Sequence, residues 1–266
     1  MAACQKSPEN PDPVDPVIPS CKITSETSDR PADPGSLEYS YGPDGLLATI
    51  LKKGSSQEAI DTLHIENDHV LRTDTDGDWL RYDYASPIRV TTIATPATGT
   101  MTPHGTSGTE ADRLEFVYSY DDRKRLIKIS ETSPDLEGDY EWDLLISYND
   151  QDNVSSLKVA FTSGPPVSVN IQVTGYDDHP TPYINIPNYR FFMNKYHWNS
   201  PDLEPLITAL SRNNPTGYTV AGAIGLTSAS MTYTYTEEGF PATRTTTQIN
   251  NGSSSSFRQA FGYTCE

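Results

Sequence analysis

The chain has 266 residues and a formal net charge of −17, with 35% hydrophobic and 21% charged residues. A chain this acidic repels phosphate backbones, so the composition argues against nucleic acid as a partner. Sixteen tyrosines, 21 prolines and 17 glycines favour half-buried strands and many turns over long helices, and no apolar run has the length of a membrane-spanning helix.

Residues 1–20 are predicted to form an anchor and a stalk. Ala2 and Ala3 precede Cys4, as small residues do at the end of a bacterial lipobox, where the cysteine is acylated. Residues 5–20 carry five prolines with acidic residues between them, which favours an extended, solvated segment. We therefore expect a lipid anchor on Cys4, and an ordinary free thiol is the alternative.

The residues after Cys4 bear on the location. The run Gln5–Glu9 resembles the polar, partly acidic tract that follows the lipidated cysteine in surface-exported lipoproteins of Bacteroidota, although Ser7 and Pro8 replace acidic positions. The resemblance implies anchoring in the outer membrane, with the cell surface favoured over the periplasmic face.

From residue 39 onward the chain repeats one pattern, in which an aromatic-x-aromatic pair, a polar turn and a second strand follow one another. Alternation puts both aromatic rings on one face of a strand, and the strand after the turn returns apolar residues to that face. A single hairpin is marginal in water, so several must lie side by side. The copies begin at Tyr39, Tyr118, Ile146 and Tyr233, with a weaker copy at Tyr82; in the third copy an isoleucine stands in place of the first aromatic residue.

These repeats predict a mainly β fold. We expect a large, curved antiparallel meander of hairpins, forming an open or partly rolled barrel with one short helix. The meander forms a single domain over residues 21–266, with insertions at 94–113 and 176–216. The first insertion is small, polar and rich in Gly and Thr; a loop of this length is either functional or disordered, and disorder is favoured.

The second insertion contains the predicted helix. Ser200, Pro201 and Asp202 form a typical helix start, because serine caps the first turn and the acid faces the positive end. The apolar residues Leu203, Leu206, Ile207 and Leu210 then share one face, and Asn213-Asn214-Pro215 ends the helix. We expect its apolar face to pack on the open side of the sheet.

An aromatic cluster precedes this helix, and it has two interpretations. The favoured one is a plug that fills the concave face of the sheet. The other is a stacking platform for a sugar, because Tyr and Trp combine an apolar ring with a polar tip. The candidate ligand-binding residues are Tyr183, Tyr189, Tyr196 and Trp198.

Of three cysteines, Cys21 begins the folded part and Cys265 lies one residue from its end. In an oxidising compartment, these two would form a disulfide that ties the two ends together. Two independent thiols are the alternative.

The order of the motifs carries a resemblance to known proteins. The hairpins resemble the YD-type repeats of large β-shell proteins. Together with the segments Cys21–Thr24, Tyr176–Tyr183, Ser211–Pro215 and Tyr263–Cys265, they more closely resemble a family of uncharacterised Bacteroidota lipoproteins carried as a domain of unknown function. That family implies no activity. Pro241, in the fourth copy, departs from the pattern and predicts an edge or a bulge there.

Catalytic and metal-binding patterns are not found. The run Asp74–Asp78 departs from a calcium loop in the position of its glycine and of its last ligand. The histidines are dispersed, and nucleophile-elbow, zinc-protease and phosphate-loop motifs do not occur. We expect no catalytic residue, no metal and no cofactor, with a carboxylate-based hydrolase as the remaining enzymatic alternative.

The leading hypothesis is an exported, lipid-anchored binding or scaffold protein of the cell envelope, accessory to an outer-membrane assembly or transporter. Its partners would be the membrane, through the lipid, and an envelope protein or a glycan. The second hypothesis is a glycan-binding module that uses the 183–198 aromatic cluster. Location and fold analogy are weak grounds for function, so these hypotheses need a site.

Overall fold

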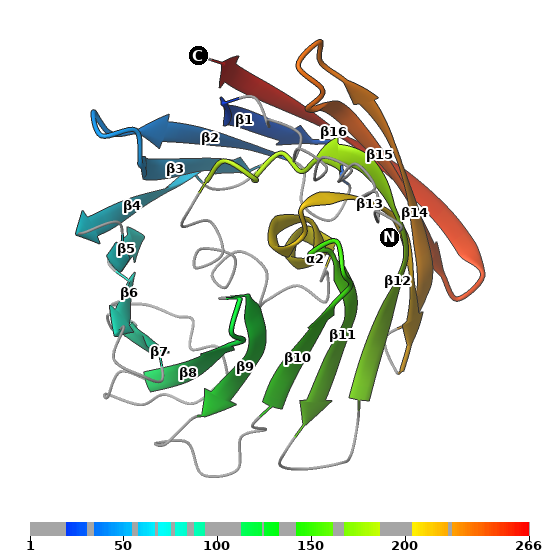
Figure 1. The fold of residues 1–266 in the computed structure, drawn as a ribbon, viewed down its shortest axis with the longest axis horizontal. Coiled ribbons are helices and arrows are strands. Elements are labelled where there is room, and N and C mark those ends of the chain that lie inside the picture. The colour runs from blue at the N-terminus through cyan, green and yellow to red at the C-terminus, as the bar shows by residue number, and fades with distance from the viewer. Residues whose placement is uncertain are drawn as a thin grey trace, which may run out of the picture.

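The computed structural model describes residues 20–30, 35–54, 58–66, 69–75, 78–83, 88–93, 113–123, 125–132, 142–161, 168–186, 204–222 and 225–265. In these ranges, sixteen strands form one sheet in which each strand pairs antiparallel with its neighbours in sequence. β1 (Cys21–Ser28) also pairs with β16 (Ser253–Cys265), so the sheet closes into a barrel (Figure 1). The predicted antiparallel meander is confirmed, and its ring is closed.

The other strands follow in chain order. They are β2 (Gly35–Tyr41), β3 (Leu47–Gly54), β4 (Glu58–Glu66), β5 (His69–Thr75), β6 (Asp78–Asp83), β7 (Ile88–Ile93), β8 (Arg113–Tyr120), β9 (Leu126–Thr132), β10 (Trp142–Tyr148), β11 (Val154–Phe161), β12 (Ser168–Pro180), β13 (Asn213–Ala221), β14 (Leu226–Tyr235) and β15 (Pro241–Asn250).

The four principal repeats are hairpins that share one register. In each, the second aromatic residue pairs with the residue six positions later, and a register shift directly precedes that aromatic. The shared offset shows that the pattern determines the strand pairing as well as the turn. Pro241 lies at such a shift, as predicted. The pairs are Tyr41↔Leu47 in β2–β3, Tyr120↔Leu126 in β8–β9, Tyr148↔Val154 in β10–β11 and Tyr235↔Pro241 in β14–β15.

Tyrosine hydroxyls bind the backbone at these register shifts. A bulge leaves a strand locally unpaired, and a buried carbonyl without a donor is unfavourable. Five tyrosines donate to carbonyls of the neighbouring strand, each at a residue beside a shift. These five tyrosines therefore supply hydrogen-bond donors to carbonyls beside the register shifts, where the backbone pairing is irregular. These bonds are Tyr41 to Ile23, Tyr148 to Leu126, Tyr176 to Val154, Tyr233 to Pro215 and Tyr263 to Pro241, at 2.5–2.9 Å.

Side chains are described in β1–β3 and β9–β16, and the two faces of these strands differ in polarity. The inward positions form one hydrophobic core, which includes Ile23, Ile50 and Leu144. Outward positions carry ion pairs between neighbouring strands, such as Lys53 Nζ with Glu38 Oε1 at 2.8 Å. Exposed hydroxyls also pair across the strands, as between Thr234 and Thr243. The outside of these strands is therefore suited to water, and the core lies inside the ring.

Helix α2 (Glu204–Leu210) lies inside the barrel (Figure 1). Leu206, Ile207 and Leu210 are buried in the core, as their predicted shared face requires. Glu204 and Thr208 are buried as well, because the closed ring surrounds a helix that we expected to cover one side of a sheet. The predicted start, at residues 200–203, lies outside the described residues, and Asn213 to Pro215 begin β13.

The insertion at 176–216 is shorter than the sequence suggests. β12 continues to Pro180 and β13 begins at Asn213, so the two strands occupy both ends of the predicted insertion at 176–216. The other insertion lies outside the described residues except for Arg113, the first residue of β8.

The disulfide between Cys21 and Cys265 is present and joins the paired ends of β1 and β16. The described chain contains no helix that is both long and apolar enough to cross a membrane.

Candidate functional site

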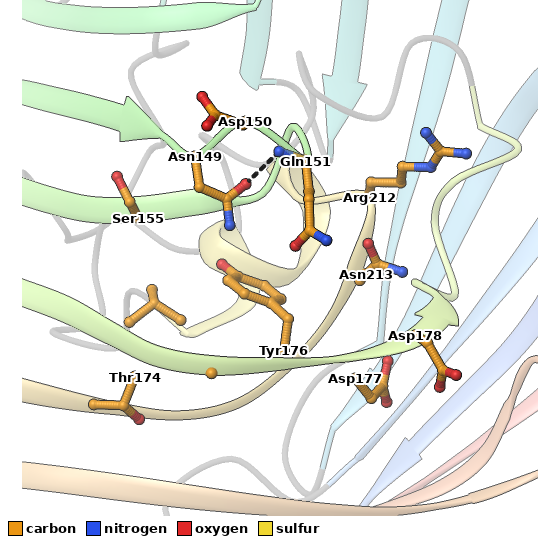
Figure 2. Close-up of a pocket in the computed structure, with 12 residues that line it drawn as sticks. Asn149, Asp150, Gln151, Ser155, Thr174, Tyr176, Asp177, Asp178, Arg212 and Asn213 are labelled. Carbon is orange, nitrogen blue, oxygen red and sulfur yellow. Dashed lines mark hydrogen bonds between the residues drawn. The ribbon is translucent and has the colours of Figure 1, made fainter. Parts of the chain in front are cut away.

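The barrel has a pocket at the end where the turns of the tyrosine-containing hairpin repeats lie. The ladder between β11 and β12 ends at Ser156↔Gln172, but β12 continues for eight residues and pairs with β13 through three register shifts. This extension and the β10–β11 turn lie on two sides of an open space of about 1,090 Å³, the rim pocket (Figure 2). It is lined by Asn149, Asp150, Gln151, Ser155, Val173, Thr174, Gly175, Tyr176, Asp177, Asp178, Arg212 and Asn213.

Asp177 organises one wall of the rim pocket. Its Oδ1 accepts the His179 backbone N–H at 2.9 Å and both the backbone and the side-chain amide of Asn214 at 3.3 Å. Its Oδ2 accepts the hydroxyl of Tyr235. Burial, and then the bond to Asp177, raises the pKa of Tyr235. With both oxygens occupied, Asp177 acts as a structural acceptor.

His179 extends this wall toward the β14–β15 turn. Its ring stacks on Tyr235, with centroids 3.9 Å apart, and its Nδ1 lies 3.0 Å from the carbonyl oxygen of Gly239. Its Nε2 lies 3.7 Å from the carboxylate of Asp178, which is 97% exposed. The ring is therefore held from two sides.

The base of the pocket is tied to the helix. Asn153 and Asn213 form a reciprocal pair, in which the Asn153 amide donates to Asn213 Oδ1 and the Asn213 backbone donates to Asn153 Oδ1. The hydroxyl of Tyr176 donates to the Val154 carbonyl and lies 3.0 Å from Ser211 Oγ, while the Ser211 backbone donates to Ile207 in α2. The helix and the pocket therefore share one hydrogen-bonded framework.

Other lining groups are not used by this framework. The side chains of Asp150, Gln151 and Arg212 make no hydrogen bond or ion pair to another described residue, although the Gln151 backbone donates to Asn149 Oδ1 at 3.0 Å. Figure 2 shows the amide of Gln151 directed toward Tyr176 and Asn213. A carboxylate, an amide and a guanidinium are thus available to a ligand, which makes this a candidate binding site.

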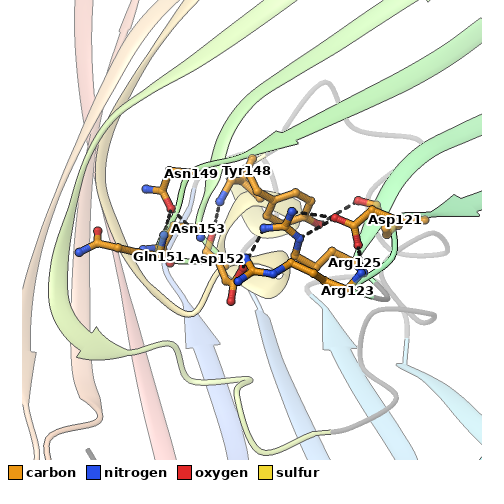
Figure 3. A network of polar contacts seen from close by, with 11 residues as sticks. Asp121, Arg123, Arg125, Tyr148, Asn149, Gln151, Asp152 and Asn153 are labelled. Atoms are coloured by element: carbon orange, nitrogen blue, oxygen red, sulfur yellow. Dashed lines mark hydrogen bonds and ion pairs between the residues drawn. The ribbon is translucent and has the colours of Figure 1, made fainter. Parts of the chain in front are cut away.

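Ion pairs between side chains hold the turns next to the pocket (Figure 3). The guanidinium of Arg125 pairs with Asp121 and with Asp152, each at 2.7 Å, and lies over the ring of Tyr148 with its centre 4.6 Å from the ring centroid. Arg123 also reaches Asp152. These contacts join the β8–β9 turn to the β10–β11 turn. They therefore hold in place the turn that lines the pocket.

A second polar cluster lies inside the barrel. Arg244 Nη2 is 2.9 Å from Glu204 Oε1, with the side chains 3% and 1% exposed, and Arg244 also donates to Gln259 and Thr208. The Gln259 amide donates to Glu26 at 2.8 Å. Burial opposes the charge on Arg244, but the Glu204 carboxylate raises the pKa of the guanidinium. This cluster attaches α2 to β15 and β16.

The predicted site residues fall in different places. Tyr183 is buried in the core, with 5% exposed, and donates to Glu26 Oε2 at 2.7 Å. It has the position expected for the plug interpretation. Tyr189, Tyr196, Trp198 and the proposed lipid site Cys4 lie outside the described residues. No three His, Cys, Asp or Glu side chains in the described ranges are arranged to hold a metal ion.

Sequence reasoning did not find the rim pocket. Its two central segments were noticed only as motifs of resemblance, Tyr176–Tyr183 and Ser211–Pro215, and the structure joins them through Asp177 and Asn214. The available signal was the concentration of Asn, Asp and Gln at residues 149–153, beside an unusually polar strand end at Asp177 and Asp178.

Comparison with known proteins supports the fold. No protein-family model and no curated protein sequence matches the chain. The structure is similar to a porin-like protein from Bacteroides vulgatus ATCC 8482, with a TM-score of 0.52 and 11% identity over 91% of this chain and 98% of that one. Another porin-like protein, from Bacteroides uniformis ATCC 8492, aligns with a TM-score of 0.46 and 15% identity over 92% and 96% of the two chains. At these identities the likeness concerns the fold alone.

Proposed function

We propose that this chain is a binding and scaffold protein of the bacterial cell envelope, anchored by lipid on Cys4 and presenting the rim pocket to a partner. The observation that carries the proposal is helix α2, which lies inside the ring and is held there by a buried ion pair. The described part of the barrel therefore supplies a rigid support, and the rim pocket is the candidate surface for recognition.

The polarity of the barrel supports attachment by an anchor. Barrels that span an outer membrane carry an apolar band outward and polar residues inward. Where side chains are described, in β1–β3 and β9–β16, the arrangement is the reverse, since Ile129 and Leu144 face the core while Lys128 and Asp143 pair on the outside at 3.0 Å. The fold shared with a porin-like protein of Bacteroides agrees with an envelope location, although the chain would sit on the membrane rather than in it.

The decisive experiment extracts the tagged protein from its native membrane with mild detergent and identifies both copurifying proteins and the mass of the Cys4 peptide. We expect a lipidated Cys4 and a stoichiometric envelope partner. A Cys4→Ser variant should move to the soluble fraction while keeping its fold. An unmodified Cys4 in the membrane-extracted protein would remove the basis for the anchor, and steady ion conductance by the purified protein in planar bilayers would contradict a scaffold that sits on the membrane.

Carbohydrate binding through Tyr189, Tyr196 and Trp198 is the second candidate. It is favoured by the concentration of aromatic residues in the same connection that supplies Arg212 to the rim pocket. Substituting Tyr196 and Trp198 should then abolish carbohydrate-dependent thermal stabilisation. A change in stability with unaltered glycan binding would assign these rings to the core.

A further inference from the structure

The groups left available in the rim pocket point to a class of ligand. Asp150 supplies a carboxylate, Gln151 a side-chain amide and Arg212 a guanidinium, and none of the three is engaged by another described residue. Planar groups of these types accept or donate two hydrogen bonds at once. Adjacent hydroxyls on a sugar ring offer the matching pairs of donors and acceptors. We propose that the rim pocket binds an uncharged oligosaccharide through Asp150, Gln151 and Arg212.

Charge argues against an acidic ligand. Two exposed carboxylates, those of Asp150 and Asp178, accompany the single cation Arg212 in the lining. The whole chain has a formal charge of −17, so an anionic sugar or a phosphate would approach against the field of the protein. A neutral polyhydroxyl ligand is not repelled.

The backbone argues against a peptide. β12 runs past the end of β11, and such an edge is where an added strand would pair. Here the edge is irregular, because the pairing of β12 with β13 shifts between Val173 and Gly175, again before Tyr176 and again before Pro180. Bulges of this kind twist an edge out of register with a new strand. The lining also lacks the row of apolar subsites that a peptide needs, since Val173 and the Tyr176 ring are its main apolar parts.

The pocket is organised before a ligand arrives. Asp177, His179 and Tyr235 hold one wall, and the Asn153–Asn213 pair holds the base. A ligand therefore does not have to order these groups, which lowers the free-energy cost of binding. The volume of about 1,090 Å³ is slightly above the usual range of small-molecule sites, which fits several linked sugars better than one.

This inference rests on the proposed function, since it names the ligand class of the same rim site. The test is a glycan array, followed by calorimetric titration of each bound oligosaccharide into the full chain. The turns of two hairpins provide a matched control. Asp121 and Asn149 each accept two backbone N–H groups of their own turn, so Asp122 and Asp150 occupy equivalent exposed positions, but only Asp150 lines the pocket.

We expect at least one uncharged oligosaccharide to bind, and we expect Asp150→Ala and Gln151→Ala each to weaken binding by about tenfold, as loss of hydrogen bonds to a ligand implies. Asp122→Ala should bind as the parent does. The proposal is overturned if no uncharged glycan on the array binds, if acidic glycans bind better, or if Asp150→Ala and Asp122→Ala behave alike. A lipidated Cys4 with an envelope partner but no glycan binding would reject this ligand class and leave the proposed function standing.

Discussion

At the scale of single residues, Arg244 has the largest predicted effect. Its guanidinium pairs directly with the buried carboxylate of Glu204. It is linked to the buried carboxylate of Glu26 through the side chain of Gln259. Arg244→Met should lower the free energy of unfolding by about 3–5 kcal/mol, because it leaves a buried charge without its partner. Urea denaturation followed by circular dichroism measures the change.

Two variants test this explanation. Lys53→Met removes an ion pair whose side chains are 44% and 50% exposed, and such surface pairs contribute at most about 1 kcal/mol. The double variant Arg244→Met, Glu204→Met removes both charges, so it should be more stable than Arg244→Met alone. Equal losses for Arg244→Met and Lys53→Met would show that the buried pair has no special role.

The tyrosine hydroxyls predict a response to alkali. Burial raises the pKa of Tyr41, Tyr176, Tyr218, Tyr233 and Tyr263, whereas tyrosines in the unfolded chain ionise near pH 10. Above about pH 10 the unfolded state therefore binds fewer protons than the folded state, and stability falls as the pH rises. Below about pH 10 these hydroxyls are protonated in both states, so they do not make the stability depend on pH.

Ultraviolet absorbance of tyrosinate, recorded together with circular dichroism, tests this. We expect the buried tyrosines to ionise late and cooperatively, together with unfolding. Ionisation of all sixteen tyrosines near pH 10 while the fold persists would contradict the hydroxyl–carbonyl bonds at the register shifts.

At the scale of elements, the helix inside the ring is the feature to test. Ile207 is fully buried in α2, so Ile207→Ala should destabilise the protein by about 2–5 kcal/mol, as cavities in a core do. Leu145→Ala is the control, since Leu145 on β10 is 39% exposed and exposed substitutions usually change stability by no more than about 0.5 kcal/mol. Thermal unfolding of the two variants, compared with the parent, distinguishes a plug from a loosely held helix.

The hairpins could be predicted from sequence because their signals are local. In each repeat the aromatic pair, the turn and the returning strand lie within about a dozen residues, so alternation and turn composition are enough. The helix face at Leu206, Ile207 and Leu210 followed from spacing in the same way. The partners of these elements could not be predicted: Arg244 lies in a threonine-rich strand, and nothing in that strand names Glu204, 40 residues earlier, as its counter-ion.

At the scale of the molecule, closure and the rim pocket depend on contacts that are distant in sequence. β1 meets β16 across a separation of 244 residues between Cys21 and Cys265. The pocket combines a turn at 149–151, a strand end at 176–178 and a segment at 212–213. No local sequence pattern specifies contacts between segments so far apart in the chain. A curved meander was therefore predictable, but its closure into a barrel was not.

The disulfide gives a prediction at this scale. Cross-linking residues so far apart restricts the unfolded chain. In the chain-entropy model, a disulfide that closes such a loop raises the free energy of unfolding by about 5 kcal/mol. The double variant Cys21→Ser, Cys265→Ser should therefore unfold at much lower urea concentration, while Cys4→Ser should match the parent. Equal midpoints for the double variant and the parent would mean that the β1–β16 ladder alone supports closure.

The position of that disulfide also determines how the barrel would respond to mechanical force. A pull transmitted along residues before Cys21 would otherwise peel β1 from its neighbours one hydrogen bond at a time, which is the weakest way to load a strand. Because Cys21 is bonded to Cys265 at the first residue of β1, the tension passes through a covalent bond into β16 before any backbone hydrogen bond is loaded. A domain pulled through the residues before Cys21 would withstand shear for as long as its surroundings stay oxidising, and it would become fragile under reducing conditions.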